Sequence, residues 1–138
     1  MTDYCKPLPT ISEDNAPFWV GLRAQELRLQ CCGACGKYRY PISPICPRCL
    51  SGEFIWQPVT GHGRVFSFVI FHRAYHRGFE GDVPYNVALI RLDEGVFMFS
   101  NIVGITNDEI ECDMPVVVDY ERVTETITLP KFRRAHKP

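Results

Sequence analysis

Apolar residues follow a helical pattern only near the start of the chain. Phe18, Leu22 and Leu29 fall on one face of a helix predicted over about 14–29, and Pro17 suits its first turn. The polar residues just before this segment offer capping side chains. The helix therefore has a single apolar face, which we expect to pack on another surface.

From residue 53 onward the pattern changes to β structure. Segments rich in Val, Ile, Phe, Tyr and Thr alternate with turn residues. Gly95 suits a tight hairpin because it tolerates a positive φ. The expected strands are 53–59, 64–72, 85–92, 96–103 and 116–129. Five strands with short turns predict a small barrel, so the fold class is mainly β. The longer connection 73–84 is the first place to expect function, because loops on a rigid scaffold usually carry it.

Length and composition limit the classes of protein that the chain can form. Its 138 residues, 46% hydrophobic and 22% charged, suit one compact domain with a small appendage and exclude a large multidomain enzyme. The start shows no signal pattern, and no apolar run approaches the ~20 residues that span a bilayer. We therefore expect a cytoplasmic protein that binds no membrane. Seven cysteines in a reducing compartment favour metal ligation over disulfides.

The net charge of −1 hides a separation of charge along the chain. Residues 54–79 carry three arginines and no acid, whereas residues 80–125 carry eleven acids and two arginines. Such zoning could give the protein a basic and an acidic face, which would suit a protein partner or an anionic ligand. The alternative is that the charges simply lie where strands face water.

Two C-x2-C knuckles, separated by ten residues, give the strongest chemical signal in the sequence. Each short turn presents two thiolates, and four sulfur ligands satisfy a tetrahedral metal. A site with four sulfurs leaves no position for a reactive water, so a structural zinc is expected, with rubredoxin-like iron as the alternative. The predicted ligands are Cys32, Cys35, Cys46 and Cys49.

The remaining cysteines and histidines have weaker assignments. Cys31 could replace Cys32 as a ligand, although the symmetric pair of knuckles gives the better geometry. Cys5 and Cys112 are interpreted as ordinary free thiols. A second metal site at His72 and His76 is a further hypothesis, which would need a helix where a strand and loop are expected.

The catalytic motifs that are most easily recognised are missing from the sequence. It contains no P-loop, GxGxxG, GxSxG or HExxH pattern. No nucleophile is visibly combined with a base and an orienting group. A binding or assisting role is therefore favoured over a self-sufficient enzyme.

Ordered motifs along nearly the whole chain resemble a known family. After Phe18-Trp19 come Cys32-x2-Cys35-Gly36 and Cys46-Pro47-x-Cys49, then Gly61-x-Gly63-x-Val65, Pro84-Tyr85, Leu92-Asp93-Glu94-Gly95-Val96, Met114-Pro115-Val116 and Leu129-Pro130-x-Phe132-Arg133. This order resembles the DUF35-type proteins, in which a rubredoxin-like zinc ribbon precedes an OB-fold barrel. The resemblance implies a helical arm (1–30), a zinc ribbon (31–53), a five-stranded OB-fold barrel (54–130) and a basic tail (131–138).

The same resemblance implies an accessory subunit of acyl-CoA metabolism. Relatives accompany thiolase-like enzymes, MaoC-type hydratases or side-chain aldolases, and the benzoylsuccinyl-CoA thiolase small subunit is similar. We therefore expect a hetero-oligomer with a thiolase-like catalytic subunit, in which the small subunit helps to bind an acyl-CoA. Residues whose cations and rings could contact CoA or the partner are Arg73, Tyr75, His76, Arg77 and Phe79.

Two other functions remain open from the sequence. Zinc ribbons and OB-folds also bind single-stranded nucleic acid, and the Arg- and aromatic-rich stretch 64–79 permits this. The balanced charge lacks the usual basic footprint and argues against nucleic acid. An independent acyl-CoA-binding or hydrolytic protein is the third hypothesis.

Overall fold

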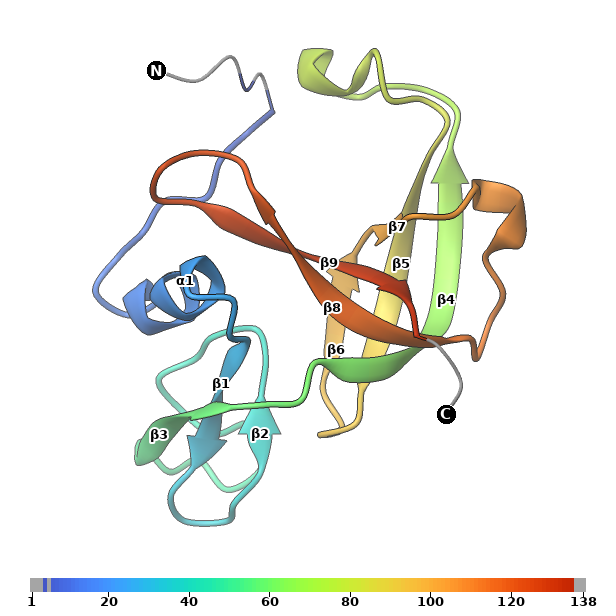
Figure 1. Ribbon diagram of the computed structural model, residues 1–138. Coiled ribbons are helices and arrows are strands. Elements are labelled where there is room, and N and C mark those ends of the chain that lie inside the picture. Colours follow the sequence, from blue (N-terminus) through green and yellow to red (C-terminus); the bar gives the residue numbers. More distant parts are fainter. Residues whose placement is uncertain (1–3, 5, 136–138) are drawn as a thin grey trace.

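Helix α1 (Ala16–Arg23) is the first element of the computed structural model, which describes residue 4 and residues 6–135 (Figure 1). Phe18 and Leu22 are buried on one face of the helix. The helix is shorter than expected, because Gln25 adopts a positive φ and Leu29 lies on a strand that begins at Arg28. The prediction of a helix up to residue 29 was therefore wrong.

A small antiparallel sheet follows the helix. It contains β1 (Arg28–Cys32), β2 (Tyr38–Arg39) and β3 (Phe54–Pro58), in the order β2-β1-β3. The segment 53–59 was expected to begin the barrel, but β3 pairs with β1 along its whole length. The sequence alone could not show this, because a strand's pattern does not name its partner.

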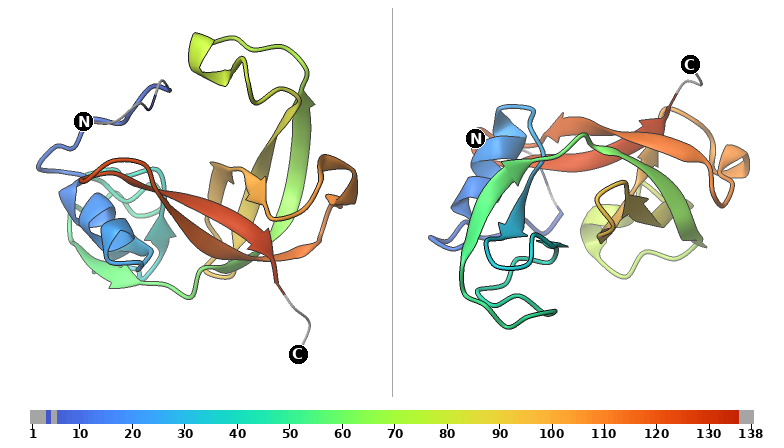
Figure 2. Two further views of the ribbon diagram at one scale, coloured as in Figure 1. Left: turned by 45° about the horizontal axis from the view of Figure 1, so that its top comes forward. Right: turned by 90° about the horizontal axis from the view of Figure 1, so that it is seen from below.

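The second sheet forms the barrel (Figure 2). Its strands are β4 (His62–Phe71), β5 (Tyr85–Leu92), β6 (Phe97–Ser100), β7 (Ile102–Val103), β8 (Pro115–Arg122) and β9 (Thr128–Arg134). The short helices η1 (Arg77–Phe79) and η2 (Asn107–Glu109) lie in its connections. The expected single strand 116–129 is two strands with a turn between them, so residues 131–134 belong to β9. His136 and Lys137 of the expected tail, and Cys5, lie outside the described residues.

The barrel closes where one strand changes partners. β6 pairs with β5, and after Asn101 the chain continues as β7, which runs parallel to β9. The side chain of Asn86 accepts a hydrogen bond from the Ile102 N–H at 2.7 Å and donates one to the Ile102 carbonyl at 3.0 Å. These bonds satisfy backbone groups that the break in the ladder would leave unpaired. Counting β6 and β7 as one interrupted strand, five chain segments make the barrel.

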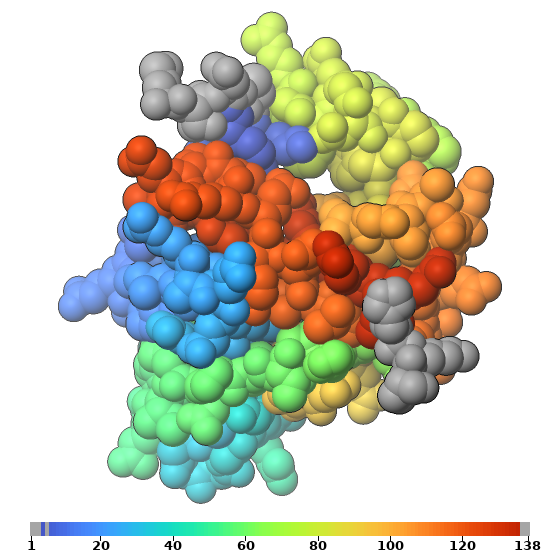
Figure 3. Space-filling model, viewed as in Figure 1, coloured from blue at the N-terminus to red at the C-terminus, as the bar shows by residue number. Residues whose placement is uncertain are grey.

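Helix, ribbon and barrel share one hydrophobic core. Phe18 and Leu29 belong to the same buried cluster as Ile90 and Phe132 from the barrel. Helix α1 contacts β8 and β9, and the space-filling view shows its surface beside the orange β8–β9 segment (Figure 3). In the described part of the chain, no helix is long and apolar enough to cross a membrane.

Candidate metal centre and surface loop

The two knuckles bring four sulfurs together at the end of the ribbon. The Sγ atoms of Cys32, Cys35, Cys46 and Cys49 all lie within 4.8 Å of one another. Cys32 Sγ lies 3.5 Å from Cys49 Sγ, and Cys35 Sγ lies 3.7 Å from Cys46 Sγ. A tetrahedron with metal–sulfur distances of ~2.3 Å has edges of about 3.8 Å. The donor set and its spacing therefore fit zinc.

Matching backbone turns build the two knuckles. The Gly36 N–H donates to the Cys32 carbonyl, and the Leu50 N–H donates to the Cys46 carbonyl, at 3.0 and 2.9 Å. Both Gly36 and Leu50 have a positive φ, of 76° and 66°. Glycine adopts this conformation easily, whereas leucine does so at a cost. The turn at Gly36 could be expected from the sequence, but the equivalent turn at Leu50 could not.

Hydrogen bonds to sulfur prepare the site for a cation. The N–H groups of Cys35 and Ala34 lower the pKa of Cys32. The backbone N–H of Cys49, followed by that of Arg48, lowers the pKa of Cys46 to about 6. The Ser51 N–H lowers the pKa of Cys49, but neighbouring cysteine sulfurs and burial outweigh it and raise this pKa to about 11. A divalent cation would offset the repulsion among four thiolates.

The other cysteines of the described chain lie apart from this cluster. The thiol of Cys31 contacts the Gly36 carbonyl at 3.5 Å and lies outside the group of four. Cys112 is exposed on the barrel. Among the described residues, His72 and His76 form no ligand group with a third His, Cys, Asp or Glu side chain.

The five loop residues expected to bind CoA or a partner lie between β4 and β5. The Arg73 guanidinium lies 5.5 Å from the centre of the Tyr75 ring, which is 74% exposed. His76 and Arg77 are exposed, and the Nδ1 atom of His76 accepts a hydrogen bond from the Gly78 N–H. The structure thus brings cations and rings onto one exposed loop.

Further residues order this loop and were missed by the sequence analysis. Tyr85 stacks on Phe79 at 5.0 Å and on Phe71 at 5.2 Å. Lys6 forms an ion pair with Asp82 at 2.5 Å and lies 5.0 Å from the centre of the Phe79 ring. Phe71 and Tyr85 flank the loop in the sequence, so a hairpin register could have paired them. Nothing in the sequence pattern points to Lys6.

A ribbon with four clustered cysteines joined to a barrel defines a zinc-ribbon and OB-fold protein. Family models bear this out: the ChsH2 rubredoxin-like zinc ribbon domain matches residues 19–54, and the ChsH2 C-terminal OB-fold domain matches residues 56–121. Together with the clustered sulfurs, these matches confirm the expected fold class and a structural zinc.

The chain belongs to the DUF35 family. A DUF35 domain-containing scaffold protein from Methanocaldococcus jannaschii is 32% identical over 95 residues, which cover 68% of this chain and 67% of that protein. A solved chain of an Ltp2-ChsH2(DUF35) aldolase is 40% identical with a TM-score of 0.83, and the match covers 94% of this chain and 100% of that one. The resemblance seen in the sequence is confirmed.

Another relative is similar over almost all of this chain but is itself much longer. A probable enoyl-CoA hydratase alpha subunit from Thermomonospora curvata is 42% identical over 132 residues, covering 94% of this chain. The match covers only 40% of the relative, so this chain spans less than half the length of that protein.

Proposed function

We propose that the chain is a non-catalytic, zinc-containing accessory subunit of a thiolase-like enzyme complex that acts on acyl-CoA in the cytoplasm. It completes the complex and helps to bind the CoA ester. The observation that supports the accessory role is the likeness to the DUF35 chain of an aldolase, at 40% identity over that chain's full length, whereas the thiolase-like partner rests on the sequence resemblance. A relative matched from end to end is a better guide to the role of a chain than one matched over a fraction.

The ribbon supplies structure in this proposal. Its four cysteines would hold a zinc ion that keeps the two knuckles together. Residues 33–37 and 47–50 are exposed and add no buried side chain to the core. A closed site of four sulfurs orders the ribbon and activates no water.

The loop between β4 and β5 would contact the acyl-CoA or the partner at the edge of the complex. CoA carries phosphates, which guanidinium groups recognise, and an adenine ring, which stacks on aromatic rings. Arg73, Arg77 and Tyr75 offer these groups from one exposed loop, with His76 and Phe79 beside them.

A hydratase is the second candidate for the catalytic partner. The Thermomonospora curvata relative is a probable enoyl-CoA hydratase alpha subunit, and a Mycobacterium tuberculosis relative, 37% identical over 112 residues, is a 3-oxo-4,17-pregnadiene-20-carboxyl-CoA hydratase alpha subunit. Both act on CoA esters by name. The chain covers 40% and 35% of these proteins, so their remaining length has no counterpart here.

Co-expression tests the proposal and chooses between the partners. The chain would be produced together with the thiolase-like protein, and separately with the hydratase-like protein, encoded nearest to it. Co-elution on size-exclusion chromatography with a gain in acyl-CoA turnover is expected for one of them. Separate elution from both, with unchanged activity, would contradict an accessory role.

A double variant tests the loop. Arg73→Ala/Arg77→Ala should raise the KM of the complex for acyl-CoA at least about tenfold, since the loss of even one hydrogen bond to a charged group costs about 1.5–3 kcal/mol. Arg23→Ala, an exposed arginine at the end of α1, is the matched control and should leave KM unchanged. An unaltered KM in the double variant would remove the loop from the CoA site.

A further inference from the structure

The outward side of β4, β5 and β6 is an unusually apolar surface. Phe66, Val69, Phe97 and Phe99 are 58%, 52%, 40% and 72% exposed. We call these four residues the aromatic face. The Phe66 and Phe97 rings meet edge to face at 5.1 Å. The opposite side of the same strands already fills the barrel, so the core does not require these side chains.

The position of this surface follows from strand register. Val65 and Ile90 are directly opposite one another and are buried in the barrel, which turns the next pair outward. A bulge after Val65 exposes both Phe66 and Ser67. Antiparallel sheets usually present polar side chains to water, whereas here aromatic rings face outward. Large exposed apolar patches of this kind mark interaction sites.

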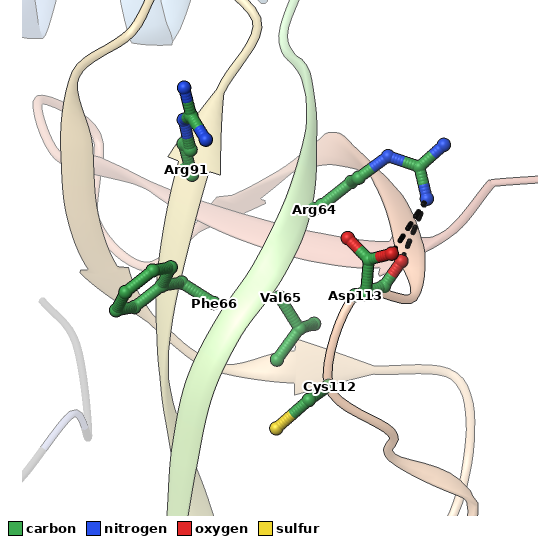
Figure 4. A pocket seen from close by; sticks show the side chains of 6 residues that line it. All are labelled: Arg64, Val65, Phe66, Arg91, Cys112 and Asp113. Atoms are coloured by element: carbon green, nitrogen blue, oxygen red, sulfur yellow. Dashed lines mark hydrogen bonds and ion pairs between the residues drawn. The ribbon is translucent and has the colours of Figure 1, made fainter.

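A pair of arginines borders the aromatic face. Arg64 and Arg91 are directly opposite on β4 and β5, an arrangement that is unfavourable for like charges. Both arginines line a pocket of about 260 Å³, whose other lining residues include Phe66, Cys112 and Asp113 (Figure 4).

Asp113 compensates only one of the two arginines. Arg64 Nη1 donates to the Asp113 carbonyl at 2.8 Å and lies 3.9 Å from the Asp113 carboxylate. The guanidinium group of Arg91 has no hydrogen bond or ion pair with any residue that the structure describes. Strands β4, β5 and β6 contain no Asp or Glu.

We propose that the aromatic face and the Arg64–Arg91 pocket are the surface on which the catalytic subunit docks, an inference that rests on the proposed function. The partner presents apolar side chains to Phe66, Phe97 and Phe99 and places a carboxylate between the two guanidinium groups. A carboxylate there would relieve the repulsion of the cross-strand pair and gain charge-assisted hydrogen bonds.

Charge favours this partner over a second copy of the chain. In a two-fold dimer the same patch meets itself. Two copies of Arg64 and Arg91 would then share one contact, and only the two Asp113 carboxylates would oppose them. A different protein with an acidic edge avoids this repulsion.

The docking surface also reaches the loop that we assign to CoA. Along the outward side of β4, Val69 is followed by Phe71, and these residues are opposite Val87 and Tyr85 of β5. Phe71 and Tyr85 stack and continue into the loop through Phe79. A partner seated on the aromatic face would therefore have this loop at its margin, where a CoA shared by both chains could lie.

Two variants test the surface with the purified catalytic chain that co-elutes with the wild type. Phe99→Ser should weaken binding at least about tenfold, because an exposed aromatic at the centre of an interface is a common hot spot. Arg91→Glu should weaken binding by a similar factor, and the loss should grow at low salt. Titration calorimetry at two salt concentrations measures both effects. Circular dichroism and zinc content establish that each variant is folded.

Matched controls come from exposed residues on other surfaces. Ile55→Ser removes a side chain that is 58% exposed on β3, and Arg23→Glu reverses a charge on α1. Both should bind within about twofold of the wild type. Unchanged binding by Phe99→Ser and Arg91→Glu while the wild type binds would overturn the docking surface and leave the accessory role intact.

The remaining outcomes separate the two proposals. A wild-type chain that binds neither catalytic protein would overturn the accessory role and the docking surface together. If light scattering shows that the isolated chain is a dimer and that Phe99→Ser makes it monomeric, a second copy covers the face, and the proposal is wrong in its partner.

Discussion

Replacing Cys35 by serine should release the metal and loosen only the tip of the ribbon. Cys35 supplies one of the four clustered sulfurs and is exposed, so the substitution changes one donor atom and little packing. Cys31→Ser is a close control. Its sulfur lies near the same turn, 3.5 Å from the Gly36 carbonyl, but outside the cluster.

The expected magnitude follows from sharing the metal's binding energy among four ligands. Structural zinc binds with an apparent free energy of about 10–16 kcal/mol, so each thiolate contributes roughly 2.5–4 kcal/mol. Zinc affinity should therefore fall roughly 100- to 1,000-fold. The barrel should persist, because its core residues Ile90, Val116 and Phe132 are fully buried and do not belong to the cysteine cluster.

Two measurements check this prediction. Competition with a chelator measures zinc affinity, and hydrogen exchange measures protection along the backbone. The Gly36 and Leu50 amides, which donate to the Cys32 and Cys46 carbonyls, should exchange faster in Cys35→Ser. Amides of the barrel should not. Wild-type zinc affinity in Cys35→Ser, or an equal loss in Cys31→Ser, would refute the ligand assignment.

Three further predictions concern the barrel and its connections. Asn86→Leu should lower the free energy of unfolding in urea by about 2–4 kcal/mol, because the N–H and carbonyl of Ile102 would lose the hydrogen bonds that Asn86 makes to them. A loss below about 0.5 kcal/mol would contradict the role of Asn86 in closing the barrel. Gly63→Ala should cost about 2 kcal/mol or more, since the added Cβ would lie 2.5 Å from a backbone oxygen of the facing strand. Gly81→Ala meets nothing within 4 Å and should be nearly neutral in the same assay. Hydrogen bonds from the backbone N–H of Thr106, and then from its hydroxyl, lower the pKa of Glu109. The ionised Glu109 carboxylate therefore stabilises the fold fully above the ordinary Glu pKa of about 4.3, and this stabilisation is lost as the pH falls below that value. The melting temperatures of the wild type and of Glu109→Gln should therefore converge between about pH 7 and about pH 3. A difference in melting temperature that stays constant with pH would show that the charge of the Glu109 carboxylate does not stabilise the fold.

Local patterns allowed the cluster of four cysteines to be predicted from the sequence. Two pairs of cysteines, each within one short turn, specify four sulfurs whatever the rest of the chain does. The choice of Cys32 over Cys31 followed from the symmetry of the knuckles, and the structure places Cys31 outside the cluster. The left-handed turn at Leu50 escaped prediction, because leucine rarely adopts that conformation.

The strands were predicted more accurately than their partners. Alternation identified β4 and β5 closely, but it could not assign β3 to the ribbon or divide the segment 116–129 into β8 and β9. A strand's apolar pattern shows which residues face a core, whereas its pairing depends on residues far away in the chain.

The sequence by itself determined the kinds of module in this protein: a short amphipathic helix, a ribbon with four sulfurs and a barrel. These features depend on neighbours within a few residues, where spacing and backbone preferences act directly. Only the tertiary structure decided that Asn86 closes the barrel at Ile102 and that Arg64 stands opposite Arg91. It also decided that four apolar side chains share one outward face. These contacts depend on strand register, which is set by the packing of the whole core and is not written in any single segment.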